Sequence, residues 1–156
     1  MNVLRRSLLK AVGSSGTIAA LLVAGLLKPT RVLAADWQRQ AFTAHGIKDS
    51  LKAWGAENSA ETRDIVINAA EISENGAQVP IEIVSHVAGS QSLAVFVEKN
   101  PMPLAASFSF SNGAIAQVRL QLKMAESSRI RVLAKAADGK TYHASREIKV
   151  TLGGCG

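Results

Sequence analysis

Apolar and polar residues alternate with a period of two through most of the chain after residue 63. In residues 114–124, every second residue from Ala116 to Met124 is apolar, and the residues between them are Gln, Arg or Lys. Such alternation is typical of strands with one buried and one solvent-facing side. It predicts seven strands, at residues 64–73, 79–86, 92–98, 104–111, 114–124, 128–137 and 140–152. In the last of these, Arg146 interrupts the apolar face.

Short turn motifs separate the predicted strands. Three of them are dipeptides that readily adopt the positive backbone angles of tight hairpins, namely Asn75-Gly76, Asn112-Gly113 and Asp138-Gly139. Seven short strands at this spacing predict an all-β fold, an immunoglobulin-like antiparallel β-sandwich. The paired cysteines of antibody domains are lacking, so the expected similarity is one of architecture.

The residues before the sandwich follow a helical period. From Trp37 to Trp54, apolar residues recur every three to four positions, which predicts one short N-terminal helix over 37–54. The polar residues 55–63 are expected to form a loop.

The first 34 residues have the three parts of an export signal. Arg5 and Arg6 resemble the twin-arginine export motif, an apolar run of 17 residues follows at 11–27, and residues 32–34 (VLA) fit a cleavage site. We therefore expect export to the periplasm by the twin-arginine pathway, with cleavage near Ala35. The alternative is a membrane anchor that stays attached, but the run is short for a stable span.

The export signal changes the meaning of the charge. The whole chain has 18 basic and 12 acidic residues, a net charge of +6 that by itself suggests nucleic-acid binding. Five of the basic residues and none of the acidic ones precede residue 35, which leaves 13 basic against 12 acidic residues and a net charge of +1. The predicted mature protein therefore gives no indication of a nucleic-acid partner or a stable membrane anchor.

The only cysteine, Cys155, lies between Gly154 and Gly156, and Gly153 precedes this pair. A single cysteine in an exported protein indicates either an intermolecular bond or a free thiol. Three glycines make residues 153–156 a slim, flexible arm, and no basic neighbour is present to favour the thiolate. This setting favours a carrier whose chemistry is supplied by partners over a self-sufficient enzyme. The predicted organisation is an export signal (1–34), a helix and loop (35–63), a sandwich (64–152) and this arm.

Other residue types give weaker indications of chemistry. His45, His86 and His143 are far apart and lack the spacing of metal ligands, and no phosphate loop or serine nucleophile motif is present, so no metal, cofactor or catalytic residue is predicted. Five basic residues on two consecutive predicted strands are best interpreted as a solvated sheet face. The alternative is a rim that contacts acidic groups of a partner or an anionic substrate. These residues are Arg119, Lys123, Arg129, Arg131 and Lys135.

Four stretches resemble one known family. The tail VTLGGCG (150–156), together with ISENGAQVPIEI (72–83), FVEKNPMPLAASFSF (96–110) and KTYHASREIKVTLGGCG (140–156), is similar to SoxY, the sulfur-carrier subunit of the periplasmic thiosulfate-oxidising (Sox) system. The family tail usually ends Gly-Gly-Cys-Gly-Gly, and this chain has one glycine fewer. The resemblance implies that Cys155 is the covalent attachment point for sulfur intermediates.

The resemblance also implies partners. These are a SoxZ-like subunit in a heterodimer, a c-type haem enzyme that conjugates thiosulfate to the thiol, a thiosulfohydrolase and a sulfane dehydrogenase, and the carrier itself holds no cofactor. Two other classes stay open at this point. One is an exported structural or interaction sandwich that forms an intermolecular disulfide through Cys155. The other is a thiol oxidoreductase, against which the lack of a Cys-x-x-Cys pair argues.

Overall fold

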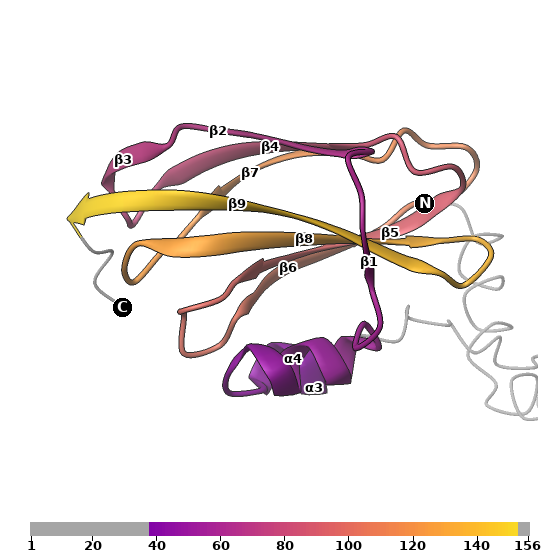
Figure 1. The fold of residues 1–156 in the computed structure, drawn as a ribbon, viewed down its shortest axis with the longest axis horizontal. Helices are drawn as coiled ribbons and strands as arrows, with labels where there is room; N and C mark the ends of the chain where they lie inside the picture. The colour runs from indigo at the N-terminus through magenta and orange to yellow at the C-terminus, as the bar shows by residue number, and fades with distance from the viewer. Residues whose placement is uncertain (1–37, 153–156) are drawn as a thin grey trace, which may run out of the picture. The chain divides into compact units, whose positions relative to one another are not determined.

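The computed structural model describes residues 38–152, which form two helices and nine strands (Figure 1). The helices are α3 (Arg39–Thr43) and α4 (Ile47–Trp54). The strands are β1 (Ala60–Glu61), β2 (Ile65–Ala69), β3 (Ile72–Asn75), β4 (Val79–Ser85), β5 (Ser90–Val97), β6 (Leu104–Ser109), β7 (Gln117–Leu122), β8 (Ser128–Ala136) and β9 (Thr141–Leu152). No helix in this part of the chain is long and apolar enough to cross a membrane.

The strands form two sheets that face each other, so the predicted β-sandwich is confirmed (Figure 1). One sheet has the order β1-β9-β8-β5-β6, with β3 also paired to β9, and the other has the order β2-β4-β7. Apolar side chains from the alternating positions of both sheets fill the space between them. Those that are buried include Ile65, Ile67, Val79, Ile81, Ile83, Leu93, Val95, Val97, Leu122, Met124, Ile130, Val132 and Ile148.

A second, smaller core lies on the outer face of the larger sheet, where the two helices pack (Figure 1). Trp54 of α4 lies edge-on to Phe96 of β5, with ring centroids 6.4 Å apart and an interplanar angle of 86°. The Trp54 indole also donates a hydrogen bond to Ser107 Oγ at 3.4 Å. Because β5 is covered by β-strands on one face and by helices on the other, residues 93–97 are all buried.

The prediction of one helix over 37–54 is wrong in detail. The chain leaves the helical conformation at Ala44, which is extended, and at Gly46, which has φ +81° and ψ 152°. Two short helices result, and Ser50 of the second donates its hydroxyl to the Ala41 carbonyl of the first at 2.9 Å. The helical spacing of apolar residues survives because both pieces turn their apolar side toward the sheet.

The predicted strand 64–73 is two strands that belong to different sheets. β2 pairs with β4, whereas β3 pairs in parallel with β9, and β1, which was expected to be loop, also pairs in parallel with β9. Residues 60–75 therefore start beside β9, cross to the smaller sheet and return. Alternation of residues shows which side chains are buried but does not show which strand lies alongside.

This crossing explains why Arg146 lies on the apolar face of β9. Between the segments paired with β1 and β3, β9 has no neighbouring strand on that side. Arg146 Nη1 reaches across to donate to the Ile67 carbonyl of β2 at 3.3 Å, whereas its buried Nε has no hydrogen-bond partner in the described structure.

Of the three predicted hairpin dipeptides, Asp138-Gly139 joins two strands that pair with each other, β8 and β9. Asn112 and Gly113 do have positive φ angles, 56° and 73°, but they connect β6 of one sheet to β7 of the other. Asn75 and Gly76 likewise connect strands of different sheets. The dipeptides therefore predict the position of a turn, and the sandwich determines whether the turn closes a hairpin.

Candidate functional site

The site that the sequence predicts lies after the last strand, and β9 is the element that positions it. β9 is 12 residues long and pairs antiparallel with β8 from Thr141 to Ile148. Its remaining residues continue past the end of β8 to Leu152, and in Figure 1 the arrowhead of β9 projects at one end of the sandwich. Gly153, Gly154, Cys155 and Gly156 follow directly and lie outside the described residues, as do Arg5, Arg6 and the rest of the predicted export signal.

The end of β9 is held by β3 and by one side chain. Gly76 N–H donates to the Leu152 carbonyl at 2.8 Å, which extends the parallel β3–β9 pairing to the last described residue. On the opposite edge, the Ser127 hydroxyl accepts a hydrogen bond from Val150 N–H at 2.8 Å and donates to the Val150 carbonyl at 3.3 Å. The last residues of β9 before the end of the described structure are therefore held by hydrogen bonds on both edges of the strand.

A protein-family model described as "Sulfur oxidation protein SoxY" matches residues 51–155 of this chain. The chain belongs to the SoxY family. The matched region covers most of the described structure and includes Cys155 as its last residue.

Solved structures agree with this membership. The sulfur carrier protein SoxY from Chlorobium limicola f thiosulfatophilum is 34% identical with a TM-score of 0.62, and the match covers 74% of this chain and 100% of that one. A variant of the superoxide reductase (neelaredoxin) from Ignicoccus hospitalis is 17% identical with a TM-score of 0.50, over 61% of this chain and 84% of that one. This second likeness concerns the fold alone. A comparison with curated proteins gave no match.

Sequence reasoning missed Ser127 as a contributor to this site. Ser127 lies in a short polar stretch, Glu126-Ser127-Ser128, that reads as an ordinary turn. Its position opposite Val150 depends on the register of β8 and β9, which pairs Ser128 with Ile148. No signal in the residue pattern alone could have found it.

The three histidines lie on different parts of the fold. His45 lies between the two helices rather than on one helix as predicted, His86 follows β4, and His143 lies on β9. His143 Nδ1 is hydrogen-bonded to Ser59 Oγ at 2.9 Å, a contact that attaches the loop before β1 to the sheet. Within residues 38–152, no three His, Cys, Asp or Glu side chains are grouped so that they could hold a metal ion.

The five basic residues do not form one stripe. Arg119 lies on β7 in the smaller sheet, whereas Arg129, Arg131 and Lys135 lie on β8 in the larger sheet, because the chain crosses between sheets after β7. Three of the five form ion pairs, Arg119 with Glu82 (2.7 Å), Arg129 with Glu147 (3.9 Å) and Arg131 with Glu98 (2.7 Å). The structure therefore contradicts the interpretation as one face or one continuous rim.

The Arg119–Glu82 pair gives a prediction about titration. Arg119 Nε and Gln117 Nε2 each donate to Glu82 Oε1 at 2.7 Å, and these hydrogen bonds, that from Arg119 first, lower the pKa of Glu82 from its ordinary value. We expect Arg119→Met to raise the pKa of Glu82 back toward that value, measured by NMR titration of the side-chain carboxyl carbon.

A lowered pKa in the folded protein means that this interaction stabilises the fold above the unfolded-state pKa of Glu82 and is lost as the pH falls through the folded-state pKa. Because Arg119 is 77% exposed, solvent screening keeps the effect on stability small. Lys99→Met, which removes a separate ion pair with Glu126, is the control and should leave Glu82 unchanged. An unaltered Glu82 titration in Arg119→Met would contradict the assignment.

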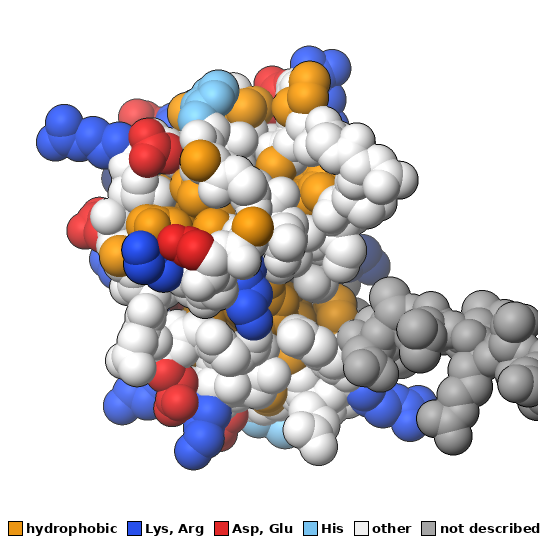
Figure 2. All heavy atoms as spheres, turned by 90° about the vertical axis from the view of Figure 1, so that its right-hand side faces the viewer, with side chains coloured by type: hydrophobic (Ala, Val, Ile, Leu, Met, Phe, Trp, Pro, Cys, Tyr) orange, Lys and Arg blue, Asp and Glu red, His pale blue; other side chains and the backbone are white. Residues whose placement is uncertain are grey.

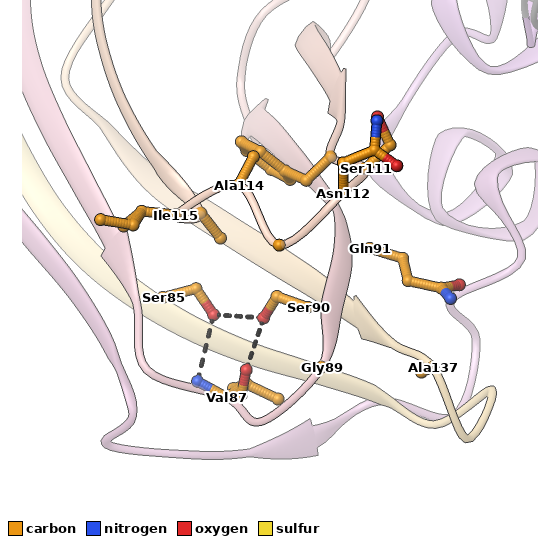
Figure 3. Close-up of a pocket in the computed structure, with 13 residues that line it drawn as sticks. Ser85, Val87, Gly89, Ser90, Gln91, Ser111, Asn112, Ala114, Ile115 and Ala137 are labelled. Carbon is orange, nitrogen blue, oxygen red and sulfur yellow. Dashed lines mark hydrogen bonds between the residues drawn. The ribbon is translucent and has the colours of Figure 1, made fainter.

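One hollow on the described surface lies at the other end of the sandwich from Leu152. It has a volume of about 480 Å³ and is lined by the β4–β5 loop, the β6–β7 loop and Ala137 of the β8–β9 turn (Figure 3). The hydroxyls of Ser85 and Ser90 bond each other at 2.8 Å, and Ser90 also donates to the Val87 carbonyl at 2.8 Å. The hydroxyls of Ser85 and Ser90 are thus occupied in closing the β4–β5 loop, and the lining carries no charged side chain.

Figure 2 views the molecule from this same end. Basic and acidic side chains are interspersed there, with small hydrophobic patches between them. In this view, the described residues form no extended patch of one sign of charge.

Proposed function

We propose that this protein is a periplasmic sulfur carrier that binds thiosulfate-derived and other sulfur intermediates covalently on the thiol of Cys155 and presents them to partner enzymes. Membership of the SoxY family makes a carrier role in sulfur oxidation the general function. The observation that carries the specific proposal is that the family match continues through the glycines to Cys155. The course of β9 supports it, because this strand brings the chain to one end of a rigid sandwich just before those glycines.

The chemistry proposed for Cys155 balances only with a partner. Joining the thiol to thiosulfate forms one S–S bond and releases one proton and two electrons, which a c-type haem enzyme would accept. Hydrolysis by a thiosulfohydrolase would then break the bond between the sulfane sulfur and the sulfonate, release sulfate and leave a persulfide on Cys155. A sulfane dehydrogenase would oxidise this remaining sulfur with water to a sulfonate on Cys155 and pass the six electrons to a haem acceptor. A second hydrolysis would release this group as sulfate and restore the thiol. The carrier contributes a thiol and a means of moving it, and Gly153, Gly154 and Gly156 keep the neighbourhood of the thiol slim.

The proposal includes a location and a partner subunit. The predicted signal, with Arg5 and Arg6, supports export by the twin-arginine pathway, and the resemblance supports a heterodimer with a SoxZ-like subunit. Periplasmic residence also suits an unpaired thiol that is oxidised in its working cycle.

Intact mass spectrometry of the protein isolated from the periplasm tests the proposal. After exposure to thiosulfate with the Sox enzymes present, we expect mass increases that correspond to added sulfur species, that map to Cys155 and that are removed by a reductant. The N-terminus of the same sample reports whether the chain begins near Ala35. An unmodified thiol in every sample would overturn the carrier role, and a disulfide dimer alone would favour the exported interaction sandwich.

A further inference from the structure

The last four residues of β9 are attached differently from the rest of the strand. The ladder with β8 ends at the pair Ser128–Ile148, so Lys149 to Leu152 lie beyond the part of β9 that pairs with β8. They pair instead with β3, in the parallel register Ile72–Lys149, Ser73–Val150 and Asn75–Leu152. β3 has no other strand neighbour among the described residues.

Side-chain hydrogen bonds complete this attachment. The Ser127 hydroxyl makes both bonds with the main chain of Val150 that a neighbouring strand would otherwise make. On the β3 side, Thr151 Oγ1 donates to the Glu74 carbonyl at 3.2 Å, and Lys149 N–H donates to the Glu71 carbonyl at 2.8 Å. We call β3 together with Ser127 the clasp.

The clasp is anchored to the sandwich, whereas the segment that it holds buries little apolar surface. Met124, which is fully buried, donates its N–H to the Gly76 carbonyl at 2.7 Å and so fixes the turn after β3. In the held segment, Lys149 and Thr151 are exposed, Leu152 is 70% exposed, and only Val150 packs partly against the core. Segments with few buried apolar contacts open locally at low cost.

We propose that residues 149–152 are a releasable section of the carrier arm, and that the clasp sets how far Cys155 reaches. With the clasp closed, two residues lie between Leu152 and Cys155, and the three residue steps from Leu152 give a reach of about 10 Å at about 3.3 Å per step. With it open, the arm starts at Ile148 and reaches about 23 Å. This inference rests on the proposed function. The two lengths of the arm give one carrier access both to shallow partner sites and to reaction centres at the end of a deep channel.

Hydrogen exchange measured by NMR on the mature chain tests the clasp without any sulfur compound or partner. In Ser127→Ala we expect the amides of Lys149 and Gly76 to exchange about tenfold faster, because two hydrogen bonds of ordinary net strength are lost. Neither amide bonds to Ser127, so their acceleration reports release of the whole segment. Ser127→Thr keeps the hydroxyl and should restore the slow exchange.

Ser128→Ala is the matched control, since the Ser128 hydroxyl accepts from Lys99 N–H and makes no bond to β9. In this variant, the amides of Lys149 and Gly76 should exchange as slowly, relative to the other strand amides, as they do in the parent protein. Acceleration of Val150 alone in Ser127→Ala would overturn the proposal, because only the directly bonded amide would then have responded. Uniform acceleration of all strand amides would also overturn it, since Ser127 would then simply stabilise the fold.

Reach is measured separately by the distance between spin labels on Cys155 and on an engineered Ser111→Cys in the β6–β7 loop, which lies at the other end of the sandwich. We expect Ser127→Ala to broaden the distance distribution and to add a population at longer distances. Identical distributions in the two proteins would contradict a role of the clasp in reach. Either result is independent of whether Cys155 carries sulfur.

Discussion

A Cys155→Ser variant is expected to form no sulfur adduct and to lower partner-dependent thiosulfate oxidation to the level measured without the carrier. The reason is chemical, because a serine hydroxyl cannot form the S–S bond on which the proposed cycle depends. The fold should be retained, since the cores between the sheets and under the helices contain no cysteine. The effect is measured in a reconstituted mixture without oxygen, as the rate at which thiosulfate reduces a haem acceptor.

The matched control is the parent protein alkylated at Cys155, which keeps every residue and blocks only the thiol. It should lose the same activity. Retained thiosulfate oxidation by Cys155→Ser, with loss only of disulfide-linked dimers, would contradict the carrier proposal and support an interaction sandwich instead.

Phe96→Ala is expected to have the largest effect on stability, a loss of about 3–5 kcal/mol in the free energy of unfolding. Phe96 is fully buried at the centre of the larger sheet and provides the ring against which Trp54 of α4 packs. Truncation removes apolar surface from the core and leaves a cavity beneath the helices, so the two short helices lose their main contact with the sheet. Urea unfolding followed by tryptophan fluorescence and by circular dichroism measures the loss.

Val66→Ala serves as the control, because Val66 lies on the outer face of β2 and is 38% exposed. Its loss should be no more than about 0.5 kcal/mol, as for surface substitutions in general. A loss below about 1 kcal/mol for Phe96→Ala would show that the helices do not depend on this contact, because buried Phe→Ala changes normally exceed that value.

The strands from β4 onward follow closely from alternation of residue types. The strand predicted at 79–86 corresponds to β4 (Val79–Ser85), and the strand predicted at 140–152 corresponds to β9 (Thr141–Leu152). Period two works here because each strand faces a core on one side. β5 also lies close to the strand predicted at 92–98, although both of its faces are buried. Its length and the turn residues around it identify this strand as well as alternation does.

Pairing between distant segments could not be predicted in the same way. Residues 64–73 alternate like one strand, yet β2 and β3 join different sheets. The basic residues on β7 and β8 were adjacent in the pattern and proved to belong to opposite sheets. In both cases the arrangement depends on which strands pair with each other, and residue alternation carries no information about strand pairing.

For the candidate site, the chemistry that we predict comes from the residues by themselves. One cysteine among glycines, in a chain with the features of an export signal and of the SoxY family, is sufficient to predict a thiol that works with partners. Tertiary structure alone decided how the segment before that thiol is held, because Ser127 meets Val150 and β3 meets Lys149 only through the register of strands that are far apart in the chain. A thiol is a property of one side chain, whereas the starting point of an arm depends on the last backbone hydrogen bonds that hold it.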